Sequence, residues 1–212
     1  MLGAVELPAR DPRIVKIGDR QPAQIRDSQL IQIMDAALAD AARRAGAWLA
    51  CKPGCTQCCH GAFAINALDV VRLQAALHAA GPETVEAVRE RARTWVAEFG
   101  PDFPGDPVTG VLGTSEEDRT RFDEFANDAP CPALNPETGL CDVYDGRPMT
   151  CRVFGPPTRV EDGLGCCELC FVGASEAEIA ACEMPVPHDL EEQLLAELGD
   201  ARETVVAFAL LR

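Results

Sequence analysis

The sequence predicts a mainly α-helical protein in which helices frame an irregular, cysteine-rich centre with at most short β-hairpins. Two observations favour this class. Apolar residues recur at steps of three and four over several long segments, and most of the eleven cysteines fall in loop-like segments rich in proline and glycine. An apolar fraction of 47% over 212 residues is enough to bury a hydrophobic core, so a bound group need not be the only source of stability. We therefore expect a single domain over 27–212.

Three helices are expected in the N-terminal half, after an extended, proline-containing arm over 1–26. Asp27 or Ser28 can cap the first helix, which runs to about Leu49 and ends before Pro53-Gly54. The second is opened by Asn66-Ala-Leu-Asp69, which resembles a capping box. The expected helices are 27–49, 66–80 and 83–99.

The second half alternates irregular segments with short helices. Residues 100–113 form a proline- and glycine-rich connector, and Ser115 can start a short helix. Residues 131–170 are rich in turn signals, with short strands expected at 140–144 and 160–164. Helices are expected over 175–183, 188–198 and 200–211.

The cysteines are the most informative feature for function. The chain start has no basic region followed by an apolar run, as a secretory signal would, so we expect a cytoplasmic protein with reduced thiols. Clustered cysteines in that setting favour metal binding over disulfides. The candidate ligands are Cys51, Cys55, Cys58, Cys59, Cys131, Cys141, Cys151, Cys167 and Cys170.

The densest group places Cys51, Cys55, Cys58 and Cys59 within nine residues. On a helical turn the last three share one face, so with Cys51 folded back over Pro53-Gly54 they can surround one ion or hold one side of a cluster. The spacing of the first three also matches the cluster motif of radical S-adenosylmethionine enzymes. The expected surroundings, however, are helix, loop and helix rather than a series of βα units.

A second constellation contains Cys131, Cys141 and Cys151 at ten-residue intervals. A turn over 135–139 would make the first two cysteines face each other. Arg147 and Arg152 are expected beside the site, where they can donate hydrogen bonds to sulfur or lower a thiolate pKa; the alternative is ordinary ion pairing.

Together these motifs resemble one family. The group ending Cys55-x2-Cys58-Cys59, the later Cys131-Pro, and Cys141-x2-Tyr144-x2-Arg147-Pro-x2-Cys151-Arg-x-Phe are similar to the CxxCxxCC (YkgJ-type) cysteine-cluster family over roughly 50–170. The chain departs from the family pattern in having three residues, not two, between its first two cysteines. The resemblance implies a zinc- or iron-chelating domain, in proteins often labelled Fe-S oxidoreductases.

The resemblance also implies a further cysteine downstream, which must be Cys166, Cys167 or Cys170. Flagellin lysine methylases share a related cluster, so a protein-modifying methyl transferase is an alternative by analogy. Cys182 is expected in the core, and His60 is expected to be no ligand although it follows Cys59.

The cofactor expected from cysteine-only ligation and from a cysteine before proline is an iron–sulfur cluster or iron, with zinc as the alternative. A redox or electron-transfer role and a zinc-stapled interaction domain both remain open, and no catalytic residue is identified. The formal net charge of -15 argues against nucleic acid as a partner, and no apolar run is long enough to span a membrane.

Overall fold

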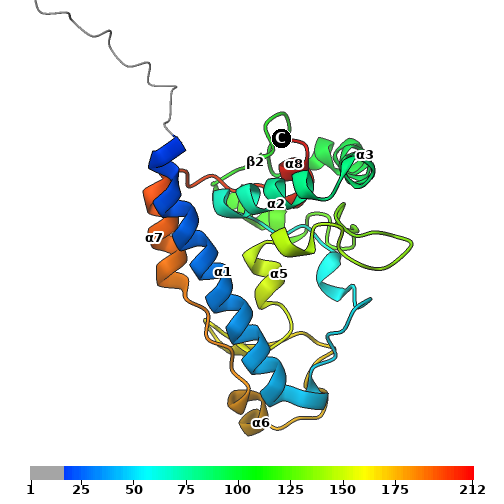
Figure 1. The fold of residues 1–212 in the computed structure, drawn as a ribbon. Helices are drawn as coiled ribbons and strands as arrows, with labels where there is room; N and C mark the ends of the chain where they lie inside the picture. The colour runs from blue at the N-terminus through cyan, green and yellow to red at the C-terminus, as the bar shows by residue number, and fades with distance from the viewer. Residues whose placement is uncertain (1–16) are drawn as a thin grey trace, which may run out of the picture.

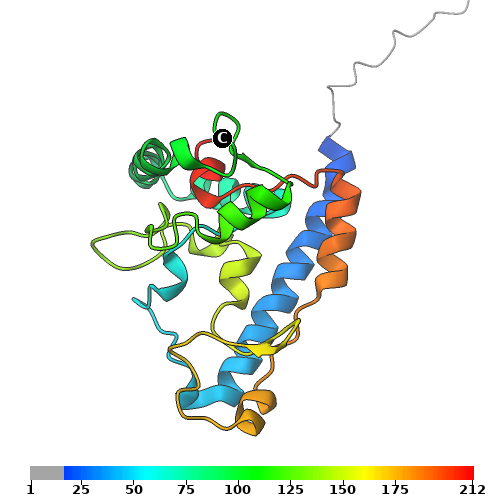
Figure 2. The ribbon, with the colours of Figure 1, turned by 180° about the vertical axis from the view of Figure 1, so that it is seen from behind.

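The computed structural model describes residues 17–212, and it is mainly helical as expected (Figure 1). Helix α1 (Ile17–Ala45) forms one side of the molecule, with α7 (His188–Leu198) beside it (Figures 1 and 2). Leu30, Met34 and Ala41 of α1 are fully buried and pack with Met184 and Leu194. These positions follow the expected steps of three and four, so the apolar stripe of α1 faces the core.

Helix α1 begins earlier than the sequence predicts. Residues 17–26 are helical rather than extended, and residues 1–16 of the expected arm lie outside the described residues. Pro22 is the sixth residue of α1, where a proline removes one backbone hydrogen bond, and the helix continues through it. Packing against α7 supports the added turns, because Arg26 forms an ion pair with Glu197.

A second layer contains α2 (Ala67–Ala79), α3 (Pro82–Phe99) and the short α8 (Val206–Leu210). Asn66 caps α2 through the expected capping box with Asp69. All five residues of α8 are buried, between α2 and α3 in Figure 1. The expected C-terminal helix is thus confirmed only over α8. The preceding residues pair with other segments instead, through Thr204 with Ile65 and the Glu203 carbonyl with the Leu112 amide.

Short elements connect these layers. Helix α4 (Glu116–Asp123) starts after its expected cap, Ser115, and α6 (Glu176–Ala181) starts after Ser175. The structure also contains 3₁₀ turns η1 (Gly46–Trp48), η2 (Gln57–Cys59), η3 (Gly100–Asp102) and η4 (Tyr144–Gly146), and the helix α5 (Met149–Val153). Helix α5 lies between α1 and the segment that carries η2 (Figure 1).

Two antiparallel hairpins are present in the described chain, β1 (Gly105–Asp106) with β2 (Val111–Leu112) and β3 (Thr158–Val160) with β4 (Gly163–Gly165). The expected strand at 160–164 is wrong in detail, because the Asp162-Gly163 turn signal falls inside it and folds the segment into a hairpin. The expected strand at 140–144 is also wrong. Only Cys141 forms a β-bridge there, with Leu134, and the chain then turns into η4.

A buried ionic network joins the two layers. Asp69, only 2% exposed, accepts a hydrogen bond from Arg72 (2.8 Å) and one from the Met149 amide at the start of α5 (2.9 Å). Arg72 also binds Asp27 of α1, with 3.1 Å between Nε and Oδ1, and lies 3.8 Å from Glu191 of α7. The Asp69 carboxylate of α2 therefore fixes the start of α5, and Arg72 links this carboxylate to α1 and α7.

We predict that Asp69→Ala lowers the free energy of unfolding by about 3 kcal/mol, because the buried Arg72 guanidinium loses one of its two hydrogen-bonded carboxylates and the buried Met149 amide loses its acceptor. Urea unfolding of protein carrying its metal measures this change. Asp40→Ala is the control, because Asp40 makes only exposed ion pairs with Arg43 and Arg44 and should cost less than about 1 kcal/mol. Equal losses in the two variants would contradict the role given to Asp69.

Candidate metal centre

The cysteines gather in two groups. The first, called here the inner group, consists of Cys58, Cys59, Cys131, Cys141 and Cys151. It draws on three segments: η2, the loop over 131–141, and α5. The second, called the outer group, consists of Cys51, Cys55, Cys167 and Cys170, with Cys166 at its edge.

Backbone pairing assembles the inner group. His60 forms an antiparallel bridge with Pro130, and the Cys131 amide donates to the Cys59 carbonyl at 2.8 Å. The expected turn over 135–139 is present, because the Asn135 amide donates to the Leu140 carbonyl and Cys141 bridges back to Leu134. Both cysteines of the loop are thereby brought to η2.

Mutual effects on pKa show that the five inner thiols are electrostatic neighbours. A hydrogen bond with Cys58 raises the pKa of Cys59, as do burial, Cys131 and Cys141. Burial raises the pKa of Cys151, and Cys131, Cys58 and Cys141 raise it further. Ionisation of one inner thiol thus disfavours ionisation of its neighbours, which is the expected behaviour of sulfur atoms that lie close together without a cation.

Cys58 is the exception within the inner group. The Cys59 thiol donates a hydrogen bond to its sulfur, and this bond, helped by the nearby Arg147, lowers the pKa of Cys58 to about 6. Burial raises the pKa of Cys131 to about 12 and also raises that of Cys141. Without a bound metal, Cys58 is therefore the inner thiol that ionises most readily, and burial or neighbouring thiols disfavour ionisation of the others.

The outer group joins the end of the first helical segment to the loop before α6. Cys51 and Cys170 share a hydrogen bond, as do Cys167 and Cys170. Burial, followed by the effects of Cys170, Cys55 and Cys167, raises the pKa of Cys51 to about 12. Cys166 is exposed, and partial burial, followed by the nearby Cys170, raises its pKa.

A glycine makes the close approach in the outer group. A Cβ atom at Gly155 would lie 2.8 Å from the Cys51 sulfur, and the residue has a φ of +121°. Its carbonyl accepts a hydrogen bond from the Cys167 amide at 3.2 Å. Only glycine combines this backbone conformation with this space, so Gly155 holds both cysteines in place.

The nine-residue cysteine motif is therefore divided between the two groups. Cys51 and Cys55 belong to the outer group, whereas Cys58 and Cys59 point to the inner one. The turn at Pro53-Gly54 and the 3₁₀ turn η2 separate them, with the Cys59 amide bound to the Thr56 carbonyl at 2.8 Å. The expectation that Cys55, Cys58 and Cys59 share one helical face is wrong, because no α-helix forms there.

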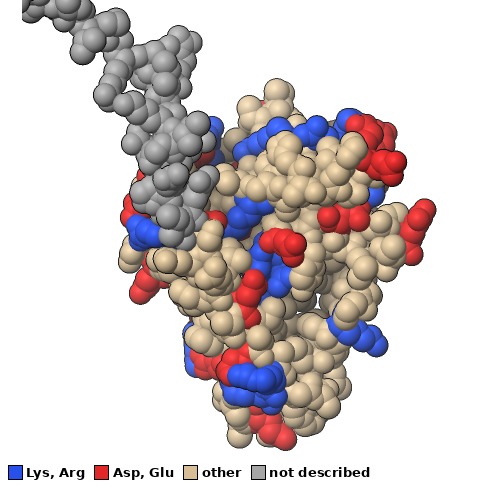
Figure 3. Space-filling view, in the orientation of Figure 1, with Lys and Arg blue, Asp and Glu red and all other residues tan. Residues whose placement is uncertain are grey.

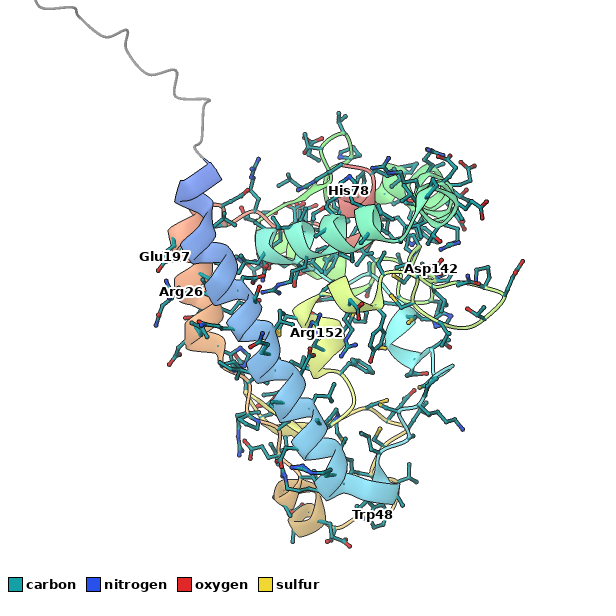
Figure 4. The ribbon with its side chains drawn as sticks, in the orientation of Figure 1. Arg26, Trp48, His78, Asp142, Arg152 and Glu197 are labelled. Atoms are coloured by element: carbon teal, nitrogen blue, oxygen red, sulfur yellow. The ribbon has the colours of Figure 1, made fainter. Side chains whose placement is uncertain are left out.

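The two expected arginines take different positions. Arg147, nearly buried, stacks 4.0 Å over the Tyr144 ring and lowers the pKa of both Cys58 and Cys141. Arg152, at the centre of Figure 4, donates to Asp35 of α1 at 2.6 Å and to the carbonyls of Arg147 and Asp145. The charge of Arg147, which also lies 3.8 Å from Asp35, thus favours the thiolate form of nearby cysteines, and Arg152 fixes the loop that carries Arg147.

Cys182 lies in the core as expected, whereas the expectation that His60 is no ligand stays a prediction. The ring of the exposed His60 hydrogen-bonds through Nδ1 with the Thr56 carbonyl at 3.0 Å. Cys182 is buried with Ala45 and Phe171 in the apolar cluster behind Cys167 and Cys170. A link that the sequence did not suggest joins the two groups, because Gln57 donates to Glu168 at 2.7 Å.

The cysteine side chains of both groups are of the type that binds a metal, but they are not arranged as a complete coordination shell. Within residues 17–212 no three His, Cys, Asp or Glu side chains surround one point as ligands would. The sulfur atoms lie close enough to interact, and side-chain movement is needed to close either group around an ion. Thiolates are soft ligands that select zinc, iron and iron–sulfur clusters, so the residues present suit such a group.

Comparison with protein families identifies the cysteine-bearing segment. Residues 50–171, more than half of the chain, match the CxxCxxCC family model, described as a "putative zinc- or iron-chelating domain". Curated proteins give no match, and neither do solved structures. Along the described chain no helix is both long and apolar enough to cross a membrane. The matched segment contains every cysteine of both groups, and the chain belongs to the CxxCxxCC family of zinc- or iron-chelating domains.

Proposed function

We propose that the chain is a cytoplasmic iron-binding protein whose inner group holds an iron–sulfur cluster with a redox or electron-transfer role. The observation that carries the proposal is that Cys58, Cys59, Cys131, Cys141 and Cys151, from three separate segments, lie near enough to influence one another's ionisation. Cysteine-only donors are the usual ligands of iron–sulfur clusters, and Cys131 precedes a proline, as cluster ligands often do.

Arg147 supports a redox role for the inner group. A cluster bound by four thiolates carries net negative charge, and nearby positive charge and hydrogen bonds adjust its reduction potential. Arg147 already favours the thiolate form of Cys58 and Cys141. Its position over Tyr144 fixes the guanidinium where it can offset the charge of a reduced cluster.

The outer group is proposed as a second thiolate site, formed by Cys51, Cys55, Cys167 and Cys170. Four thiolates are sufficient for one tetrahedral ion. The site joins the segment after α1 to the loop before α6, where it backs onto the apolar cluster around Phe171. This placement favours a structural ion, so the zinc-staple alternative applies to the outer group in particular.

The identity of the bound metal distinguishes the iron–sulfur assignment from a protein that binds zinc alone. We expect protein purified without oxygen to contain iron and acid-labile sulfide, with a broad visible absorption that reductants bleach. Zinc alone, in colourless protein, would contradict the iron–sulfur assignment and leave a chelating or structural domain.

Serine variants test the division into two groups. Cys151→Ser should remove most of the iron and sulfide while leaving the outer ion bound, because Cys151 couples only to inner thiols and Asp69. Cys170→Ser should remove the outer ion and leave the visible spectrum near that of the wild type. Cys182→Ser is the matched control, since Cys182 is a buried cysteine outside both groups and should keep all the metal. Parallel loss of all metal from both ligand variants would contradict two separate sites.

Metal binding should also release protons. Zinc added at pH 7 to metal-free Cys170→Ser protein should bind mainly at the inner group, because the outer group then has three of its four proposed ligands. It should displace about three protons if four thiolates including Cys58 bind it, because burial or neighbouring thiols keep the other inner thiols protonated. The inner affinity should therefore rise with pH above 7, as protons compete less for sulfur. Calorimetry in two buffers of different ionisation enthalpy measures the release, and a value below one proton would contradict thiol ligation.

A further inference from the structure

A groove of about 630 Å³ lies beside the inner group, between α3 and the segment over 126–136. One wall is a single face of α3, since its lining positions 90, 91, 94, 95, 98 and 99 recur at helical spacing. These positions span about 13 Å, at 1.5 Å per residue. The groove is thus long and open rather than enclosed, about the length of four extended residues.

The groove reaches the inner group through Cys131. This residue lines the groove between Pro130 and Pro132, and its amide is bound to the Cys59 carbonyl. Arg91 fixes this part of the wall, because it donates to the Pro132 carbonyl at 2.8 Å and to Asp142, which Figure 4 labels. A molecule in the groove therefore lies against one candidate ligand of the inner group.

The lining combines apolar walls with unmatched negative charge. Trp95 and Phe99 pack together, with ring centroids 5.0 Å apart, and both line the groove. Its one basic lining residue, Arg91, is already paired with Asp142. Glu98 and Asp128 are exposed and have no hydrogen-bond or ion-pair partner within the described part of the chain.

Charge complementarity identifies the occupant. Acidic and basic side chains both lie at the edge of the molecule formed by α3 in Figure 3, but those of the groove that lack a partner are acidic, and the whole chain has a net charge of -15. Lysine and arginine combine an apolar stem with a charged head, which suits aromatic walls beneath free carboxylates. We propose that this groove binds a short, extended, basic segment of a partner protein and places it against the Cys131 edge of the inner group.

This proposal concerns a partner and goes beyond metal binding; only the reason for its location beside Cys131 rests on the proposed function. The two can fail separately. Loss of peptide binding with full metal content would count against the groove alone, and peptide binding by protein without iron would count against the cluster alone.

The test uses fluorescence anisotropy with a fluorescein-labelled hexapeptide, Lys-Leu-Lys-Pro-Lys-Leu, and the metal-loaded full chain. The double variant Glu98→Gln/Asp128→Asn should weaken binding at least about fivefold, because two ion pairs are lost. Thr94→Arg places a cation on the exposed α3 wall and should abolish binding. The control Glu161→Gln/Asp162→Asn removes the same charge from the exposed β3–β4 turn and should bind as the wild type does.

Equal affinity in the groove and control variants would show general attraction to an acidic surface and overturn the proposal. Equal binding of a peptide with glutamate in place of lysine would also overturn it. If hexylamine displaces the labelled peptide at the same concentration as unlabelled peptide does, the groove is a site for small amines, and the assignment of a peptide is wrong. Metal content measured in each variant excludes loss of the inner group as the cause of weak binding.

Discussion

The rest of the structure depends on one constraint, which is the free-energy cost of ionising several thiols that lie close together and away from water. A thiol binds metal only as a thiolate, and several buried thiolates cannot coexist without a cation. In the inner group four of the five thiols have raised pKa values, and only Cys58 is lowered, with Arg147 close by. A bound cation would favour ionisation of the same thiols that now oppose it. The arrangement is therefore best understood as a ligand set whose charge a metal balances.

The helical frame places that ligand set through polar contacts as well as through apolar packing. Asp69 fixes the first amide of α5, and α5 carries Cys151. Arg152, one residue later, holds the Arg147 carbonyl and reaches α1 through Asp35. The long helix α1, far in sequence from the second cysteine motif, thus sets the position of both Cys151 and Arg147. Helix α7 contributes through Glu191, which lies near Arg72 in the same network.

Much of the fold could be predicted from the sequence where local signals agree with packing. The capping box at Asn66 and the cap at Ser115 mark helix starts correctly. The division of the cysteines could not be predicted, because Cys55 and Cys58 are close in sequence and only long-range pairing sends them apart. The pairing of His60 with Pro130 and the contact of Gly155 with Cys51 decide it. The early start of α1 and the burial of Asp69 likewise depend on partners more than forty residues away, Glu197 for Arg26 and Met149 for Asp69.

The central claim is that sulfur atoms from distant segments bind metal in two places. X-ray absorption at the iron and zinc edges of protein purified without oxygen tests it most directly. The account predicts that sulfur dominates the ligand shell of each bound metal, at about 2.3 Å, with an additional iron–iron contribution at the iron edge. A shell of oxygen and nitrogen atoms would contradict it, because the metal would then lie outside both cysteine groups.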